Sequence, residues 1–114
     1  MGKQEVITLH IDTSRSDSIR VGLEDASGRQ VTKERDSTVA KAQEVLPMIE
    51  ELLMKHEFRL DDVAAIQVNT GPGSYTGLRV GIAIANMLGF LLGVPINGMP
   101  AGQQAFPVYE GDRW

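Results

Sequence analysis

The chain has 114 residues, which is enough for one domain with a buried core. A formal net charge of −4 gives no general attraction to a phosphate backbone, which argues against tight RNA binding by this chain alone. The sequence holds no cysteine, which excludes disulfides, thiolate metal sites and cysteine nucleophiles and fits a cytoplasmic location.

Three strands are predicted at the start of the chain. β-Branched residues and alternating apolar positions predict strands at Glu5–Ile11 and Ser18–Glu24, with a shorter one near Arg29–Lys33. The polar turn Asp12–Asp17 and the hairpin turn Asp25–Gly28 separate them. Because tight turns join consecutive strands, the three are predicted to form an antiparallel meander.

A first helix is predicted over Thr38–His56, with Ser37 or Thr38 capping its N-terminus. Pro47 lacks the N–H that the helix ladder needs, so we expect a kink there or a helix that restarts at Glu44–Pro47. The apolar stripe of this helix is predicted from the helical spacing of Val39, Ala42, Leu46, Ile49 and Leu53.

A second helix is predicted after a short apolar strand. Val63–Val68 suits a central strand, and Thr76–Leu92 suits a helix that Gly93 and Pro95 end. The most apolar stretch, residues 80–96, falls short of the roughly 20 residues that a membrane helix needs. Glycines and an asparagine also interrupt it, so we expect a buried helix and no membrane span.

A fifth strand is predicted at Pro95–Asn97, which gives the order β-β-β-α-β-α-β. That order predicts an α/β fold with a five-stranded mixed sheet and two main helices. It is the arrangement of a single ribonuclease-H-like or actin-like ATPase lobe, by analogy of fold. The lobe is expected to comprise residues 1–99, followed by a C-terminal tail over 100–114 that Tyr109 and Trp114 anchor.

The glycine-rich loop Gly71–Gly77 matches neither common phosphate-binding motif. A P-loop needs a lysine after its last glycine, where this chain has Leu78, and the glycine spacing is one residue too long for a dinucleotide fingerprint. Pro72 also removes one backbone N–H from the loop. The loop is predicted to be a tight turn capped by Ser74 or Thr76, and the alternative is an anion held at the helix N-terminus.

The turn after the first strand resembles the first phosphate loop of actin-like ATPases, although the same residue types also form ordinary polar turns. His10 and His56 are isolated from each other and from paired carboxylates, so no metal site is predicted. No catalytic residue is predicted either, since the chain has no Gly-x-Ser-x-Gly elbow. The candidate contacts for an anion or nucleotide are Asp12, Thr13, Ser14, Gly73, Ser74 and Arg79.

Small residues recur at every fourth position of the second predicted helix and form one slanting ridge that lets another backbone approach closely. Glycine inside a helix costs about 1 kcal/mol relative to alanine, so this ridge needs a compensating contact. Apolar residues cover the remaining faces, which predicts either burial against the first helix or docking of a partner. The small-residue ridge consists of Gly77, Gly81, Ala85, Gly89 and Gly93.

Four segments of the chain resemble the bacterial TsaB (YeaZ) family. They are the turn Ile11–Ser14, the Leu-Pro-Met-Ile of Leu46–Ile49, the glycine segment Gly71–Gly81 and the closing Gly93–Ile96. The glycine segment, part of NTGPGSYTGLR, is highly specific, whereas the Asp-Thr-Ser turn is not. The resemblance extends over about Glu5–Gly98.

The resemblance implies a role in making threonylcarbamoyladenosine beside the tRNA anticodon. Family members are non-catalytic partners of the related TsaD subunit, which carries the metal and transfers the threonylcarbamoyl group, and the small ATPase TsaE joins them. We therefore expect a non-enzymatic cytoplasmic scaffold that meets tRNA only indirectly. No cofactor is expected on this chain alone, and the resemblance leaves room for ATP or ADP only at an interface between subunits.

The family resemblance also implies that the two helices dock the TsaD-type subunit, and that the same surface can make a homodimer. This implication gives the small-residue ridge a role at an interface. The residues expected at the interface are Leu46, Met48, Leu53, Gly77, Gly81, Ala85 and Gly89.

Two features depart from the family pattern. Full-length relatives carry a second actin-like lobe where this chain ends, and one lobe cannot enclose ATP, so independent catalysis is not expected. The segment Phe106–Tyr109 resembles a Pro-x-Tyr element near the end of full-length relatives. This resemblance implies two equally weighted alternatives: a compact natural form that lacks the second lobe, and a truncated chain. Two alternatives to the scaffold are a superfamily enzyme, metallopeptidase-like or nucleotide-binding, and a homodimeric structural module.

Overall fold

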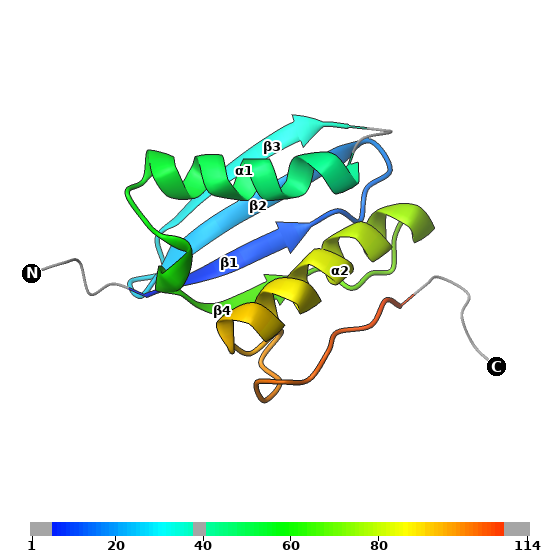
Figure 1. Cartoon of the computed structure of the whole chain (residues 1–114). Helices are drawn as coiled ribbons and strands as arrows, with labels where there is room; N and C mark the ends of the chain where they lie inside the picture. Colours follow the sequence, from blue (N-terminus) through cyan, green and yellow to red (C-terminus); the bar gives the residue numbers. More distant parts are fainter. Residues whose placement is uncertain (1–5, 38–40, 109–114) are drawn as a thin grey trace, which may run out of the picture.

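The computed structural model of the protein describes residues 6–37 and 41–108 (Figure 1). The described chain follows the predicted order of strands and helices up to the second helix. The elements are β1 at Ile7–Asp12, β2 at Ser18–Asp25, β3 at Gln30–Asp36, α1 at Lys41–Lys55, a short 3₁₀ helix at Leu60–Asp62, β4 at Val63–Val68 and α2 at Tyr75–Leu92.

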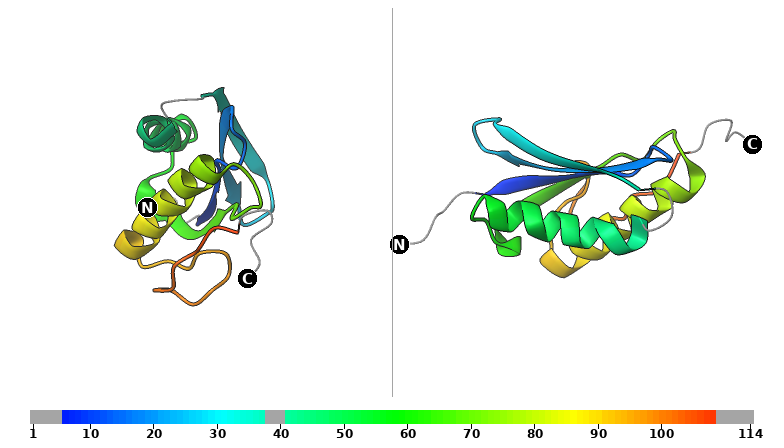
Figure 2. Two further views of the ribbon diagram at one scale, coloured as in Figure 1. Left: turned by 90° about the vertical axis from the view of Figure 1, so that its right-hand side faces the viewer. Right: turned by 90° about the horizontal axis from the view of Figure 1, so that it is seen from above.

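The strands form one mixed sheet in the order β3-β2-β1-β4. β1 pairs antiparallel with β2 and parallel with β4, and β2 pairs antiparallel with β3. Both helices cover the same face of this sheet (Figure 2). The alternating side chains Ile7, Leu9 and Ile11 of β1 therefore point into the core between the sheet and the helices, where all three are buried.

The predicted fifth strand at Pro95–Asn97 is wrong, because this segment makes a single parallel bridge between Ile66 and Ile96. The backbone turns away at Asn97, whose φ of 54° lies in the left-handed region. Its side-chain amide then takes the place of strand backbone. It accepts from the Val68 N–H at 2.8 Å and donates to the Val68 carbonyl at 3.1 Å. The sheet therefore has four strands and an edge completed by an amide.

Asn97→Ala is expected to lower the free energy of unfolding by about 2–3 kcal/mol, because it leaves two Val68 backbone groups unpaired and keeps a non-glycine residue in the left-handed region. Urea unfolding followed by circular dichroism would measure this loss. Gln103→Ala, an exposed change in the following loop, serves as the control and should stay within about 0.5 kcal/mol of wild type. Equal stability of the two variants would show that the amide does not complete the edge.

α1 runs through Pro47 as one helix, which corrects the predicted restart at Glu44–Pro47. Proline at this position removes a hydrogen bond to the carbonyl of Gln43, and both residues lie on the exposed side, where water can satisfy that carbonyl. The predicted cap Thr38 lies outside the described residues.

The buried face of α1 is rotated from the predicted stripe. Ala42 is exposed and Leu46 is half-buried, whereas Ile49 and Leu53 are buried as expected. Apolar residues occupy more than half of this helix, so their spacing allowed two neighbouring stripes, and packing on the sheet selects one of them. The stripe that faces the sheet consists of Lys41, Val45, Met48, Ile49, Leu52 and Leu53.

α2 begins and ends as the sequence predicts. Ser74 caps its N-terminus by accepting from the Gly77 N–H at 3.2 Å, and Gly93, with φ of 67°, closes its C-terminus in the left-handed conformation. By length and mean hydropathy α2 could cross a membrane, but 39% of it is buried inside the structure. The core helix of a soluble protein passes the same test, so this is weak evidence for a span.

The segment after α2 returns along the β4 edge of the molecule, where Figure 1 shows it in orange and red. Asn86 of α2 holds this segment, since its side chain donates to the Ala105 carbonyl at 3.0 Å and accepts from the Ala105 N–H at 2.8 Å. The Val108 N–H donates to the carbonyl of Thr70 at 2.7 Å. The predicted anchors Tyr109 and Trp114 lie outside the described residues.

Candidate docking face

The turn after β1 contacts α2 through Thr13, which is 1% exposed. Its hydroxyl donates to the Gly77 carbonyl at 2.5 Å and accepts from the Gly81 N–H at 3.0 Å. These two backbone groups are four residues apart and would otherwise bond to each other. The Thr13 hydroxyl thus bridges two successive turns of α2, and it both donates and accepts a hydrogen bond inside the fold.

The small-residue ridge faces inward. A Cβ atom on Gly77 would clash with the Thr13 carbonyl oxygen, one on Gly81 would clash with the Thr13 hydroxyl, and one on Gly89 would lie 2.6 Å from Ile96 Cδ1. The close contacts of these glycines are therefore mainly with Thr13, in the turn after β1, and with Ile96, while Lys41 of α1 also approaches Gly77. Of the residues expected at the interface, Leu46 is half-buried and the others are buried: Met48, Leu53, Gly77, Gly81, Ala85 and Gly89.

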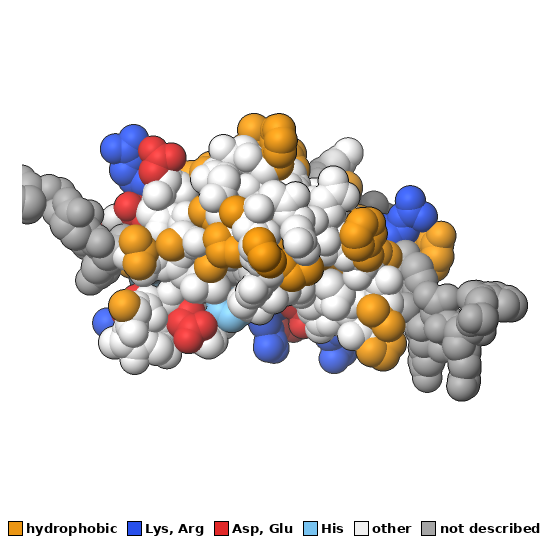
Figure 3. Space-filling view, turned by 90° about the horizontal axis from the view of Figure 1, so that it is seen from below, with side chains coloured by type: hydrophobic (Ala, Val, Ile, Leu, Met, Phe, Trp, Pro, Cys, Tyr) orange, Lys and Arg blue, Asp and Glu red, His pale blue; other side chains and the backbone are white. Residues whose placement is uncertain are grey.

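The opposite side of α2 is exposed and largely apolar. Phe90 is 84% exposed, Leu91 67% and Met87 41%. Seen from below, hydrophobic side chains recur along the middle of the molecule (Figure 3). The sequence held the signal for this face, because apolar residues surround the ridge on all sides. We define the outer face of α2 as the stripe of residues Thr76, Arg79, Val80, Ala83, Met87, Phe90 and Leu91.

A hollow of about 490 Å³ lies between α1 and α2 at the N-terminal end of the outer face. Among the described residues that line it, only Arg79 is charged. The Arg79 Nη1 donates to the Tyr75 hydroxyl at 3.0 Å. The guanidinium carbon lies 5.5 Å from the centre of the Tyr75 ring, a cation–π distance. The hollow is lined by Ala42, Tyr75, Thr76, Arg79, Val80, Ala83 and Ile84.

The predicted anion contacts meet at the turn after β1, apart from Arg79 on the outer face. The Asp12 carboxylate accepts from the Ser14 N–H at 2.9 Å, from the Ser14 hydroxyl at 2.6 Å and from Asn69 Nδ2 at 3.3 Å. Burial raises the pKa of the Asp12 carboxyl, but these hydrogen bonds and the charge of Arg20 outweigh it and hold the pKa below its ordinary value. The carboxylate is therefore charged and would repel an anion.

Gly73 and Ser74 lie in the loop between β4 and α2, which packs against the turn after β1. The Ser74 N–H donates to the Ser14 carbonyl at 2.8 Å, and a Cβ atom on Gly73 would lie 2.7 Å from that carbonyl oxygen. The hydroxyl of Ser74 already caps α2. These contacts hold the loop before α2 against the turn after β1, so the polar groups of the loop are already used within the fold.

Lys41 is a buried residue whose place at this turn the sequence reasoning missed. Its Nζ donates to the Arg15 carbonyl and ties the first turn of α1 to the turn after β1. Burial lowers the pKa of the Lys41 ammonium, and the charges of Asp17 and Asp12 oppose this without cancelling it. Lys41 lies on the buried stripe of α1 together with Val45. The predicted stripe was a different one, so the sequence did not indicate that Lys41 is buried.

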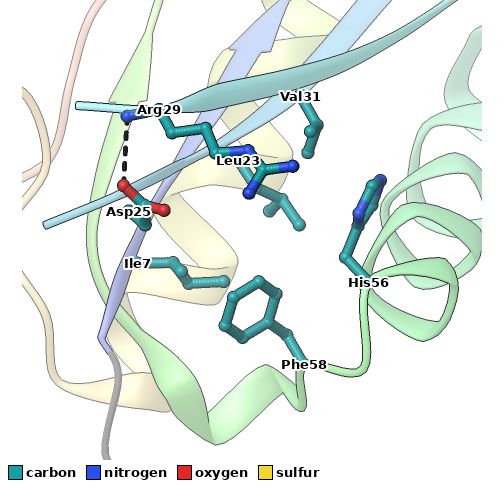
Figure 4. Close-up of a pocket in the computed structure, with 7 residues that line it drawn as sticks. All are labelled: Ile7, Leu23, Asp25, Arg29, Val31, His56 and Phe58. Atoms are coloured by element: carbon teal, nitrogen blue, oxygen red, sulfur yellow. Dashed lines mark hydrogen bonds between the residues drawn. The ribbon is translucent and has the colours of Figure 1, made fainter. Parts of the chain in front are cut away.

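A second hollow, of about 210 Å³, lies at the opposite end of the sheet (Figure 4). Arg29 and His56 point toward each other across it, above Phe58. The neighbouring Asp25 carboxylate accepts from the Arg29 backbone N–H at 3.0 Å, within the hairpin turn. Across residues 6–37 and 41–108, no group of three or more His, Cys, Asp or Glu side chains could hold a metal ion. The other histidine, His10, pairs with Glu24 at 2.8 Å.

Comparison with known protein families gives one match over most of the described chain. The model described as "TsaD: tRNA N6-adenosine threonylcarbamoyltransferase" matches residues 36–103. A "tRNA threonylcarbamoyladenosine biosynthesis protein TsaB" of Haemophilus influenzae is 40% identical over 73 residues, which cover 60% of this chain and 31% of that protein. A "tRNA N6-adenosine threonylcarbamoyltransferase" of Ralstonia pickettii is 38% identical over 71 residues, which cover 60% of this chain and 20% of that protein.

Comparison with solved structures also finds a YeaZ protein. "YeaZ from Pseudomonas aeruginosa" superposes with a TM-score of 0.75 and 32% sequence identity, over 83% of this chain and 44% of that chain. The chain spans less than half the length of each of these relatives.

Proposed function

Because this chain belongs to the TsaB (YeaZ) family, we propose that it is a non-catalytic partner subunit in the biosynthesis of tRNA threonylcarbamoyladenosine. In this proposal it docks a TsaD-type catalytic subunit through the outer face of α2 and the adjoining side of α1. The lobe itself is of the actin-like type, which the β-β-β-α-β-α order and the mixed sheet support.

The observation that carries the proposal is the exposure of large apolar side chains on one helix. Phe90, Leu91 and Met87 lie together on the outer face of α2 and together present a contiguous apolar strip. Such strips on soluble proteins mark sites of contact with other proteins. Met54, on α1, is also exposed.

No catalytic role is assigned to this chain. The polar groups at the turn after β1 are engaged with one another: Thr13 with α2, Asp12 with Ser14 and Asn69, and Ser74 with Gly77. A chain whose polar groups are used in this way suits a supporting role. ATP or ADP, a TsaE-type ATPase and tRNA would then be met only in the assembled complex, in the cytoplasm.

The test is to size the chain by light scattering alone and mixed with a TsaD-type subunit from the same organism. We expect a complex whose mass is the sum of one copy of each protein. Separate peaks at micromolar concentrations would sink the proposal. A dimer of this chain that persists when the TsaD-type subunit is added would favour the homodimeric structural module.

A further inference from the structure

Arg79 is the one charged side chain among the described residues that line the hollow on the proposed docking face. Its neighbours there include the apolar side chains of Val80, Ala83 and Ile84. Most of an arginine side chain is a hydrocarbon stem, but the guanidinium at its end carries five N–H donors and a permanent charge. Whatever covers this hollow must accommodate that charge.

No carboxylate in the described part of the chain neutralises Arg79. Within the described residues, ion pairs join Arg15, Arg20 and Arg35 to carboxylates, and none joins Arg79. The Tyr75 hydroxyl and ring hold the guanidinium in place, but both are uncharged. Arg79 is therefore positioned on the outer face without an acidic partner among residues 6–37 and 41–108.

A protein that covers the hollow removes the water that now solvates Arg79. A buried charge left without an opposite charge is strongly unfavourable, whereas a carboxylate can accept two parallel hydrogen bonds from a guanidinium. A nucleotide phosphate suits the hollow less well, because its walls are mostly apolar and the nearest helix N-terminus is already capped by Ser74.

We propose that the TsaD-type partner places an Asp or Glu carboxylate against Arg79, and that this ion pair selects the partner that the apolar face accepts. The inference rests on the proposed function, since it names a group on the same partner. Apolar contact supplies the affinity, and the ion pair rejects proteins that lack a carboxylate at this position.

The test is calorimetric titration of the TsaD-type subunit into wild type, Arg79→Lys and Arg79→Met at 50 and 500 mM NaCl. Arg79→Met keeps the apolar stem, and we expect it to weaken binding at least thirtyfold at low salt and to abolish the salt dependence. Arg79→Lys keeps the charge without the planar fork, so an intermediate loss is expected. Arg29→Gln, at the opposite end of the sheet, is the control and should bind as wild type does.

The partner carboxylate is then found by changing each Asp and Glu on the partner's contacting face to its amide. For the carboxylate that pairs with Arg79, the amide change weakens binding to the wild-type chain but has no further effect on binding to Arg79→Met, as a double-mutant cycle requires. The inference is overturned if Arg79→Met binds within twofold of wild type, or if Arg29→Gln weakens binding equally. It is also overturned if the isolated chain binds ADP through Arg79 while partner binding is unchanged.

The two proposals fail in different ways. A wild-type chain that does not bind the TsaD-type subunit overturns the proposed function and this inference with it. Binding that survives Arg79→Met overturns the inference alone.

Discussion

Gly77→Ala is expected to lower the free energy of unfolding by about 3 kcal/mol or more, because the new methyl group has no room. The Cβ atom would meet the carbonyl oxygen of Thr13, which is backbone and is held by the end of β1. By helix propensity alone the change would stabilise α2 by about 1 kcal/mol, so the steric term must exceed that gain. Urea unfolding measures the difference, and a variant as stable as wild type would contradict the packing described.

A matched control is Ala83→Gly, at an exposed position of the same helix. This substitution lowers helix propensity without altering buried packing, and it should lower the free energy of unfolding by about 1 kcal/mol. A rescue experiment separates the two glycines further. Gly81 faces the Thr13 side chain, so Thr13→Ala should relieve much of the damage of Gly81→Ala. The same change should not rescue Gly77→Ala, because Gly77 faces backbone.

Phe90→Glu is expected to weaken binding of the TsaD-type subunit by at least about a hundredfold, which corresponds to about 2.8 kcal/mol. Phe90 is the most exposed large apolar side chain of α2, and a carboxylate there would be buried without a partner when the face is covered. Its exposure also means that the free chain should keep its melting temperature. Calorimetric titration gives the affinity, and thermal unfolding checks the fold.

The control for Phe90→Glu is Gln67→Glu, which adds the same charge to an exposed position of β4. It should bind as wild type does. If both variants bind normally, the outer face of α2 is not the docking surface. If Phe90→Glu only turns a dimer of this chain into a monomer, then the face serves self-association.

Local patterns were enough to predict most of the fold. Alternation located the strands, and the caps Ser74 and Gly93 located both ends of α2. The prediction of a fifth strand was wrong because a short apolar run after a helix does not indicate the conformation of Asn97. Asn97 turns the backbone away and pairs with β4 through its side chain. Of the two alternatives at Pro47, a kink or a restart, the restart is wrong, since solvent on the exposed side can satisfy the carbonyl that proline leaves unpaired.

The α2 residues expected at an interface lie on the buried side of that helix, whereas the face proposed for docking lies on its exposed side. Every side of α2 carries small or apolar residues, so spacing alone could not decide which side met the sheet. The deciding contact is long-range: Thr13 lies 64 residues from Gly77 in the sequence, and its hydroxyl donates to the Gly77 carbonyl. Contacts of this kind follow from how the whole sheet packs on the helices.

Both edges of the sheet are closed to further strands. β3 places Lys33, Glu34, Arg35 and Asp36 in succession along one edge, and charged residues discourage a neighbouring chain from adding a strand. At the other edge Asn97 and the returning segment at Val108 take the backbone groups that an added strand would use. Growth of assemblies by adding strands at either edge of the sheet is therefore disfavoured, so association through a face of the molecule is favoured over pairing of strand edges.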